Sequence, residues 1–333
     1  MRERLVKLLV IGYGSIGRKH AANARATGHE VALLRHSKEN PNQDGLREYY
    51  SLEEAVANGK TDGAIICSPT SRHLPDVELL VERRIPFLLE KPPAAEMEST
   101  LQMEKLLLQS GFGEYAIGFN LRYYPALLFI KDFLPQLGKV YSARIAAGYY
   151  LPNWRRDVDY RETSSAKKEL GGGVHIELVH EIDYLVWFFG CPEKVSGYIN
   201  HVSDLEISTA DICAALLRYR DDSVVELHLD YLSHRYLRGC QIVAENGTLE
   251  WEMNGGSVYH TERAGRASEE VFSPTPGYDF NETYVEELKD FIGIIQGRTE
   301  SRMEMSDCVK TMRVLEAIRL SSEKEEWVSL GDI

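Results

Sequence analysis

The sequence predicts a doubly wound α/β domain at its start and leaves room for a second domain. Strand-like and helix-like segments alternate through residues 1–120, and a G-x-G-x-x-G motif stands between the first strand and the first helix. Such alternation is typical of a parallel sheet with helices on both faces. The chain has 333 residues, which at ~150 residues per domain is enough for about two domains.

The first repeating unit contains the glycine motif. The segment LVKLLVIGYGSIGRKHAANARATGHEVALLRHS predicts a strand over residues 7–11, a glycine turn, a helix ending at residue 28 and a strand over residues 30–35. In such a unit the first glycine makes the tight turn, the second lets a pyrophosphate approach, and the third lets helix and strand pack closely. The phosphates then sit on the helix N-terminus. The candidate cofactor-binding residues here are Gly12, Gly14, Ser15, Ile16 and Gly17.

Further strands and helices follow in the same alternation, which makes a Rossmann domain the expectation for this half. GAIICSP reads as a buried strand, LPDVELLVERR as an amphipathic helix and IPFLLEKPP as another strand. The ends of these two strands supply further candidate cofactor-binding residues: Ser68, Pro69, His73, Glu90 and Lys91.

The end of the second strand bears on cofactor choice. An NAD-binding fold usually places Asp or Glu there, ~20 residues after the glycines, to bind the ribose 2′-hydroxyl. Residues 35–38 contain no carboxylate, and Arg35 offers a guanidinium that would suit a 2′-phosphate. The cofactor is therefore expected to be NAD or NADP, with a preference for NADP. The alternative is that Arg35 stacks on the adenine.

Composition excludes several partner classes. The formal net charge of −13 opposes the phosphate attraction that supports nucleic-acid binding. No window approaches the ~20 uncharged apolar residues of a membrane-spanning helix, and the N-terminus does not read as a secretory signal. The five cysteines are scattered, with no C-x-x-C pair, which favours reduced thiols and a cytoplasmic location.

Four segments, in order, resemble the Gfo/Idh/MocA oxidoreductase family, typified by glucose-fructose oxidoreductase and inositol 2-dehydrogenase. They are the glycine motif, EKPP at residues 90–93, GFNLRYYPAL at residues 118–127 and GGGVHIELVHEID at residues 171–183. The closing stretch YVEELKDFIGIIQGR also looks like the family's terminal helices.

The resemblance implies a dinucleotide-binding Rossmann domain over residues 1–120 and a substrate-binding α+β domain with an open antiparallel sheet over residues 121–333. It also implies a homo-oligomer, either a dimer or a tetramer. It carries two catalytic roles to this chain: Lys91 lies near nicotinamide and substrate, and His180 acts as acid/base. Asn120 and Arg122, in the crossover segment, become candidate substrate residues.

The segment after the glycine run predicts a helix over residues 174–189. On it, Glu177, His180 and Asp183 would share one face. A carboxylate behind the imidazole would fix its tautomer. The usual family pattern has Asp four residues before the histidine, where this chain has Ile176. Either Glu177 takes over that aspartate's role, which we favour, or Glu177 is only structural. Glu181 and Asp183 are expected to cap, pair or line the domain junction.

No metal is expected. Glu177 and His180 form half of a di-iron motif, but no second such pair is evident in the sequence. A zinc site from His175, Glu177 and His180 fails because a spacing of five turns His175 away from His180. His175 is expected to be a satisfied, partly buried histidine.

The segment YYLPNWRRDVDYRETSSAKKELGGG is rich in cations and aromatic groups. Its candidate substrate residues are Trp154, Arg155 and Tyr160, alongside Lys91 and His180. They suit an anionic, carbohydrate-like small molecule. Acidic residues are interleaved, so the charges could instead pair with one another.

These observations predict a dehydrogenase that moves a hydride between NAD(P) and a secondary hydroxyl or ketone of a sugar, sugar acid, nucleotide sugar or cyclitol. Imidazole has a pKa suited to accepting the hydroxyl proton, and the Lys91 ammonium would stabilise a developing alkoxide. Two alternatives remain open: a redox-neutral NAD-dependent glycoside hydrolase, and a catalytically silent dinucleotide-binding sensor.

Overall fold

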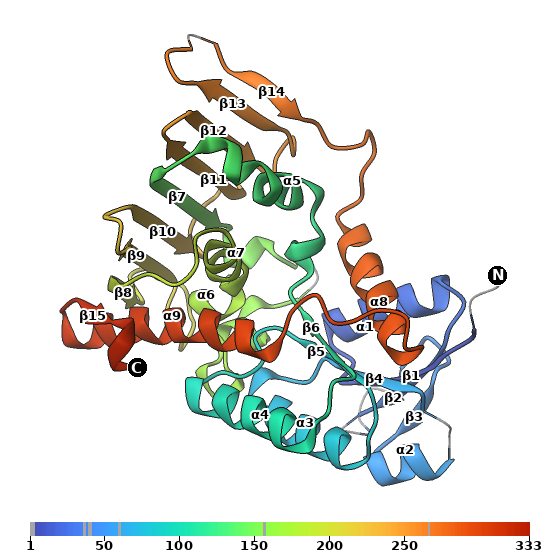
Figure 1. The fold of residues 1–333 in the computed structure, drawn as a ribbon. Coiled ribbons are helices and arrows are strands. Elements are labelled where there is room, and N and C mark those ends of the chain that lie inside the picture. Colours follow the sequence, from blue (N-terminus) through green and yellow to red (C-terminus); the bar gives the residue numbers. More distant parts are fainter. Residues whose placement is uncertain (1–3, 36–37, 39–41, 59–60, 156–157, 266) are drawn as a thin grey trace. The chain divides into compact units, whose positions relative to one another are not determined.

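The chain forms two compact units. The computed structural model describes residues 4–35, 38, 42–58, 61–155, 158–265 and 267–333. Unit 1 comprises Met1–Asn120 and Phe280–Val309, and unit 2 comprises Leu121–Asp279 and Lys310–Ile333. Each unit has its own sheet (Figure 1).

Unit 1 contains a six-stranded sheet with the order β3-β2-β1-β4-β5-β6 in the described part of the chain. All its strand pairs are parallel. The strands are β1 (Lys7–Ile11), β2 (Glu30–Leu34), β3 (Arg47–Tyr49), β4 (Gly63–Ile66), β5 (Phe87–Glu90) and β6 (Tyr115–Gly118). The predicted doubly wound fold is confirmed. The strand order reverses between β1 and β4, and such folds bind ligands outside the strand carboxyl ends at that point.

Helices cover both faces of this sheet. They are α1 (Ser15–Ala26), α2 (Leu52–Asn58), α3 (His73–Glu82), α4 (Met97–Ser110) and α8 (Asn281–Ile295). Figure 1 shows α3 and α4 on one face and α1 with α8 on the other. The strands β1, β4, β5 and β6 are buried along almost their whole length, as a sheet covered on both faces requires. Val10, Ile65 and Phe291 are fully buried in the core between the sheet and the α1–α8 layer.

The return of α8 to unit 1 differs from the expected division at residue 120. The chain leaves unit 1 after Asn120, but Phe280–Val309 packs with it again. Asn23 and Asn281 exchange two amide hydrogen bonds, of 3.2 and 2.9 Å. Gly63 leaves space for Ile295, whose Cδ1 would lie 2.6 Å from a Cβ placed there. Thus α8 is the final layer of the nucleotide-binding fold.

Unit 2 contains a nine-stranded sheet with the order β14-β13-β12-β11-β7-β10-β9-β8-β15 among the described residues. Its strands are β7 (Val140–Gly148), β8 (Lys194–Asn200), β9 (Ile212–Arg218), β10 (Val224–Asp230), β11 (Leu237–Ala244), β12 (Gly247–Glu252), β13 (Val258–Glu262), β14 (Glu269–Phe272) and β15 (Val328–Ser329). The pair β7–β10 is parallel and the other pairs are antiparallel. The predicted α+β class is confirmed, with a mixed sheet in place of a purely antiparallel one.

One face of this sheet carries the helices of unit 2. These are α5 (Pro125–Phe133), α6 (Val174–Glu177), α7 (Val179–Phe189) and the unit 2 part of α9 (Met305–Lys324). Gly197 of β8 lies so close to α9 that an added Cβ would stand 2.7 Å from the Ile318 backbone oxygen. Phe129 of α5 stacks on Phe272 of β14, with ring centroids 5.2 Å apart. These contacts fix α5 and α9 against the two ends of the sheet.

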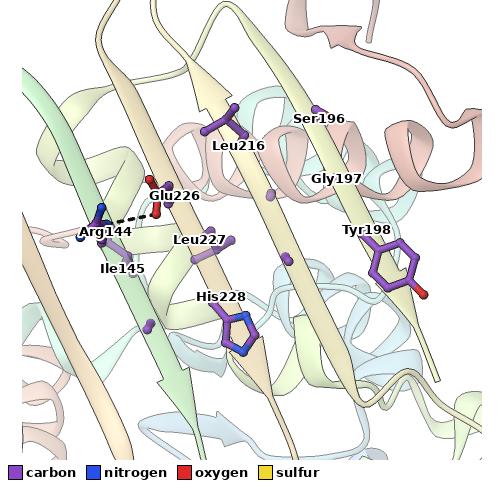
Figure 2. A pocket seen from close by; sticks show the side chains of 12 residues that line it. Arg144, Ile145, Ser196, Gly197, Tyr198, Leu216, Glu226, Leu227 and His228 are labelled. Atoms are coloured by element: carbon purple, nitrogen blue, oxygen red, sulfur yellow. Dashed lines mark hydrogen bonds and ion pairs between the residues drawn. The ribbon is translucent and has the colours of Figure 1, made fainter. Parts of the chain in front are cut away.

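The opposite face is open. Figure 2 shows Arg144, Glu226, His228, Leu216 and Tyr198 side by side on neighbouring strands, with the helices behind the sheet. These residues line a shallow groove of about 500 Å³. Tyr198 and Leu216 keep 48% and 38% of their surface exposed, although large apolar side chains are usually buried.

No helix in the described residues is long and apolar enough to cross a membrane.

Candidate active site

The glycine loop of unit 1 has the geometry that a dinucleotide requires. Gly12 has a φ of +90°, and a Cβ there would lie 2.7 Å from the Cys67 backbone oxygen. A Cβ on Gly17 would lie 2.2 Å from the Gly12 oxygen, so α1 can approach β1 only without a side chain. Gly14 meets nothing within 4 Å, which leaves the α1 N-terminus open at Ser15 and Ile16. First-turn N–H groups have no partner within a helix and suit a pyrophosphate.

The end of β2 carries an ion pair that the sequence did not predict. The Arg35 guanidinium donates to Glu48 Oε1 over 2.8 Å. Glu48 belongs to β3, which pairs with β2 in the register Leu33↔Glu48. Hydrogen bonds from Tyr50, Asn42 and Arg35 lower the pKa of Glu48 to about 2, so it is ionised. Residues 35–38 themselves contain no carboxylate, but the neighbouring strand supplies one beside Arg35. Residues 36 and 37 lie outside the described residues.

The loops after β4 and β5 are joined by His73, at the start of α3. Its Nδ1 lies 3.0 Å from the Pro92 oxygen and its Nε2 lies 3.0 Å from the Ser68 oxygen. The ring is 1% exposed, and burial lowers its pKa. Ser68 Oγ donates a hydrogen bond to Asp76 over 2.6 Å. The next residue, Pro69, directly precedes the short turn that leads into α3. His73 therefore holds two loops together, and its burial favours a supporting role over direct cofactor contact.

Lys91 directly follows β5, at the sheet edge where the glycine loop also lies. The Lys91–Pro92 peptide bond, whose isomer the sequence leaves open, is cis. The Lys91 main-chain N–H donates to Glu90 Oε2 over 3.3 Å. Lys91 is half-buried and Glu90 is buried. Parallel strands bring their carboxyl ends to one edge, so unit 1 presents Lys91 on the edge that carries the dinucleotide loop.

The predicted single helix over residues 174–189 is wrong. It is interrupted at Leu178, whose φ of −97° and ψ of 31° lie between α6, which ends at Glu177, and α7, which begins at Val179. Helical periodicity across this break therefore does not determine whether Glu177 and His180 share one face. His180 lies in the first turn of α7 and is 6% exposed. Glu177 accepts a hydrogen bond from Ser165 Oγ over 2.7 Å.

The next two carboxylates of α7 are paired, as expected. Arg122 forms two hydrogen bonds with Asp183, of 2.9 and 2.8 Å, and both side chains are buried. Glu181 pairs with Arg238 of β11 at 2.8 Å and is fully buried. In unit 1, Asn120 is 1% exposed and donates to Thr283 Oγ1 over 2.7 Å. These internal partners favour a structural role for Asn120 and Arg122 over the predicted substrate contact.

The cationic segment contains the mutual charge pairing that the sequence allowed as an alternative. Arg161 pairs with Asp159 at 2.7 Å and with Glu206 at 2.8 Å, and Lys167 pairs with Glu162 at 2.6 Å. These cations are occupied by neighbouring carboxylates. A small cavity, however, is lined by three predicted substrate residues and by the donor to Glu177: Trp154, Arg155, Tyr160 and Ser165. Arg156 lies outside the described residues.

His175 is partly buried, but its environment differs from the expectation of a satisfied ring. Its Nδ1 has no hydrogen-bond partner among the described residues. The ring folds back over Gly173, where a Cβ would lie 2.9 Å from Cε1. Burial, with a contribution from Arg319, lowers the pKa of His175 to about 4. It is a neutral histidine near pH 7.

A doubly wound unit with an open glycine loop, followed by an α+β unit that carries a buried histidine, defines a class of dinucleotide-dependent oxidoreductases. Residues 6–112 match the NAD-binding Rossmann fold of the Gfo/Idh/MocA oxidoreductase family, and residues 135–330 match that family's C-terminal alpha/beta domain. The chain belongs to the Gfo/Idh/MocA oxidoreductase family. It is an enzyme of the oxidoreductase class, as the resemblance predicts.

Individual relatives are distant. The rhizopine catabolism protein MocA of Rhizobium meliloti is 26% identical over 199 residues, which cover 55% of this chain and 57% of that protein. The chain thus spans little more than half the length of this relative. D-xylose 1-dehydrogenase (NADP(+)) 2 of Haloferax volcanii is 23% identical over 96% of this chain and 98% of that protein. A levoglucosan dehydrogenase in complex with NADH has a similar fold, with a TM-score of 0.85 at 17% identity over 98% of this chain and 99% of that one.

Sequence reasoning missed three residues of these environments. Glu48 gave no signal, because only strand pairing brings it to Arg35. Ser165 gave none either, because it reaches Glu177 from a separate turn. His20, whose Nε2 lies 2.6 Å from Glu90 Oε1, did leave a signal, since it lies on the buried stripe of α1 with Gly17, Ala21 and Ala24. A histidine on an otherwise apolar stripe predicts a buried polar partner.

Proposed function

We propose that this protein is an NAD(P)-dependent dehydrogenase acting on a secondary hydroxyl, or the matching ketone, of a sugar, sugar acid, nucleotide sugar or cyclitol. One observation carries the proposal: in unit 1 the open α1 N-terminus and Lys91 lie on the same carboxyl edge of the parallel sheet. That edge is where doubly wound folds bind dinucleotides. The relatives named above, a xylose dehydrogenase and a levoglucosan dehydrogenase, act on carbohydrates.

The proposed chemistry assigns one task to each residue. A bound nicotinamide supplies the acceptor for the hydride that leaves the alcohol carbon. The His180 imidazole takes the hydroxyl proton, because its ordinary pKa lies near working pH. The Lys91 ammonium donates a hydrogen bond to the same oxygen and stabilises its developing charge. The reverse reaction returns the proton from His180 to the new alkoxide.

Two further assignments concern the partner of His180 and the residues that contact the substrate. We propose that Glu177, fixed by the Ser165 hydroxyl, supports the imidazolium form of His180. We also propose that Trp154, Arg155 and Tyr160 contact the substrate. They lie around one small hollow together with Ser165; the hollow itself is too small for a sugar, so the contact would be made on the outer surface of these side chains. The exposed Arg155 guanidinium would bind an anionic group such as a carboxylate or phosphate.

For the cofactor we keep a preference for NADP as a proposal. Arg35 has five N–H donors, and the Nη1 group donates to Glu48. A 2′-phosphate would compete with Glu48 for the same guanidinium. NAD could instead use Glu48 as the carboxylate that accepts from a ribose hydroxyl.

We further propose that the protein is a cytoplasmic homo-oligomer, either a dimer or a tetramer. The open face of the unit 2 sheet exposes Tyr198, Leu216 and Tyr259, and a second copy would cover them. The five cysteines are all free, in keeping with a reducing compartment. Light scattering on the purified protein measures the oligomeric state. A monomeric wild type would overturn the proposal, and an oligomer that Tyr198→Glu leaves intact would rule out this interface.

The function is tested by nicotinamide absorbance with NAD and NADP in parallel, against a panel of sugars, sugar acids, inositols and nucleotide sugars. We expect substrate-dependent reduction that falls by about 10² or more in His180→Ala and in Lys91→Met. Release of a glycosidic substituent without net cofactor reduction would favour the hydrolase instead. Three results together would favour the sensor: the dinucleotide binds tightly, nothing in the panel turns over, and His180→Ala binds the metabolite as the wild type does.

A further inference from the structure

Unit 1 contains a buried cluster of titratable groups that the proposed chemistry does not use. It consists of His20 on α1, Glu90 at the end of β5 and Glu287 on α8. Their side-chain nitrogen and oxygen atoms lie within 4.8 Å of one another. Their exposed fractions are 0%, 6% and 0%. Burying one histidine and two carboxylates is costly unless each group has a defined partner or loses its charge.

The geometry excludes the simplest explanation, a metal held by all three side chains. His20 Nε2 lies 2.6 Å from Glu90 Oε1. Two ligand atoms at ~2.1 Å from a tetrahedral zinc ion stand about 3.4 Å apart, so this pair is too close to share an ion. A separation of 2.6 Å is that of a strong hydrogen bond, in which Nε2–H donates to the carboxylate.

Glu90 connects the cluster to Lys91. While Oε1 accepts from His20, Oε2 accepts from the Lys91 main-chain N–H over 3.3 Å. The neighbouring strand leaves room for this carboxylate: Gly118 pairs with Glu90 in the sheet, and a Cβ on it would lie 3.3 Å from Glu90 Cδ. The carboxylate is thus confined between α1 and β6 and joined to the residue that follows it.

Glu287 forms the far wall of the cluster. Neither of its oxygens has a hydrogen-bond partner among the described residues. The titratable groups facing it are Glu90 from β5, His20 from α1, Cys67 directly after β4 and Asp290 on its own helix. A carboxylate buried beside two other carboxylates would be strongly destabilised, whereas a neutral carboxylic acid would not. Burial and the charges of Glu90 and Asp290 accordingly raise the pKa of Glu287 well above its usual range.

We propose that His20, Glu90 and Glu287 are positioning residues for Lys91. His20 orients the Glu90 carboxylate, neutral Glu287 closes the site without adding a second negative charge, and Glu90 holds the Lys91 main chain. The point from which the lysine side chain reaches substrate is thereby fixed. This inference rests on the proposed function only for the catalytic role of Lys91; the cluster and its link to the Lys91 amide do not depend on it.

The first test follows the Lys91 amide, which needs no substrate. Isotope-labelled lysine makes the signal visible, and its loss in Lys91→Arg assigns it. In Glu90→Gln, one amide oxygen cannot serve both donors, and an NH₂ group would face either His20 or Lys91. We expect the Lys91 amide to exchange with solvent about tenfold faster or more in this variant. His20→Phe keeps a ring but removes the donor, and should loosen the same amide if Glu90→Gln does not fold.

The second test separates position from general stability. We expect Glu90→Gln to lower kcat at least about tenfold with little change in the dissociation constant for the dinucleotide. Glu287→Gln copies the neutral acid and should keep kcat and Lys91 exchange within about threefold of wild type, while Glu287→Ala should not. An infrared band of a protonated carboxylic acid at pH 7 should disappear in Glu287→Gln.

Three results would overturn the inference. One is an unchanged Lys91 amide in folded Glu90→Gln. Another is a loss of kcat in Glu287→Gln as large as that in Glu287→Ala, because a glutamine would fail to replace Glu287 only if that carboxylate were charged. The third is the absence of the protonated carboxyl band. If the amide and infrared results hold but no substrate turns over, the proposed function fails and the cluster's structural link to Lys91 stands.

Discussion

The Arg35 guanidinium at the end of β2 donates to the Glu48 carboxylate of β3 over 2.8 Å. If the dinucleotide binds as proposed, this cation and this anion lie beside the ribose 2′ position, where NAD and NADP differ. A 2′-phosphate needs the guanidinium, and a 2′-hydroxyl needs an acceptor. Arg35 therefore favours the 2′-phosphate of NADP, and Glu48 opposes it. Glu48 favours the 2′-hydroxyl of NAD by accepting its hydrogen bond.

Glu48→Gln should shift selectivity toward NADP. Removing the carboxylate frees Arg35 and removes a repulsion of the 2′-phosphate, so we expect kcat/KM for NADP relative to NAD to rise about tenfold. Arg35→Ala is the matched variant and should shift the ratio the other way. Parallel titrations with both cofactors measure it. Equal ratios in all three proteins would show that the pair does not contact the ribose.

Gly14→Ala and Gly17→Ala should have opposite profiles. A Cβ on Gly14 meets nothing within 4 Å in the protein, so we expect an unchanged melting temperature but dinucleotide affinity weakened about tenfold or more, because the methyl group enters the phosphate path. A Cβ on Gly17 would lie 2.2 Å from the Gly12 oxygen, so that variant should lose stability. Calorimetry and thermal unfolding separate the two. A Gly14→Ala protein that binds NAD(P) normally would contradict the proposed phosphate position.

Much of the fold could be predicted from the sequence because local patterns specify it. The alternation of strands and helices and the glycine spacing predict the parallel sheet of unit 1. The return of α8 could not be predicted in the same way, because it depends on contacts such as Asn23 with Asn281, 258 residues apart. Pairing of that range leaves no periodic signal.

The sequence predicted which residue types form the candidate site better than it predicted how those residues are arranged. The helical period continues through Leu178 without Gly or Pro, so no local signal announces the break between α6 and α7. The Glu48 pair depends on the register of β2 with β3, and the Ser165 contact on the fold of a loop. Local sequence could not have supplied either.

Removing both members of the buried Arg122–Asp183 pair should cost less stability than the two single removals added together. In Arg122→Met, the buried Asp183 carboxylate loses its cation and keeps the hydrogen bond from Thr311 Oγ1, 3.3 Å away. We expect the free energy of unfolding to fall by about 3–5 kcal/mol in each single variant, and by less than the sum in Arg122→Met/Asp183→Leu. Denaturant unfolding measures this cycle. Additive losses would show that the two side chains stabilise the fold independently.

Ser165→Ala should lower turnover while leaving dinucleotide affinity unchanged. Loss of its hydroxyl removes a 2.7 Å hydrogen bond to Glu177, which we propose supports His180 in its charged form. We expect kcat to fall about tenfold and its pH profile to move, with Glu177→Gln giving a similar shift. Ser164→Ala, in the same turn, is the control. A loss confined to KM would place Ser165 in the substrate cavity only.

His175 should make the protein less stable in mild acid. Its ordinary pKa is 6.5, and burial lowers the pKa in the folded protein to about 4. The unfolded chain therefore binds a proton at a higher pH than the folded chain does. The stabilisation is complete above the unfolded value, is lost as pH falls from about 6.5 toward 4, and stays constant below that.

His175→Gln removes this dependence without adding a charge. At ~1.36 kcal/mol per pKa unit, the wild type should lose up to about 3 kcal/mol more than the variant over that interval. Denaturant unfolding of both proteins at a series of pH values measures the difference, because carboxylates that titrate in the same range contribute equally to the two. Parallel curves would show that the histidine is already hydrated in the folded chain. A difference that grows only below pH 4 would assign the acid sensitivity to another group.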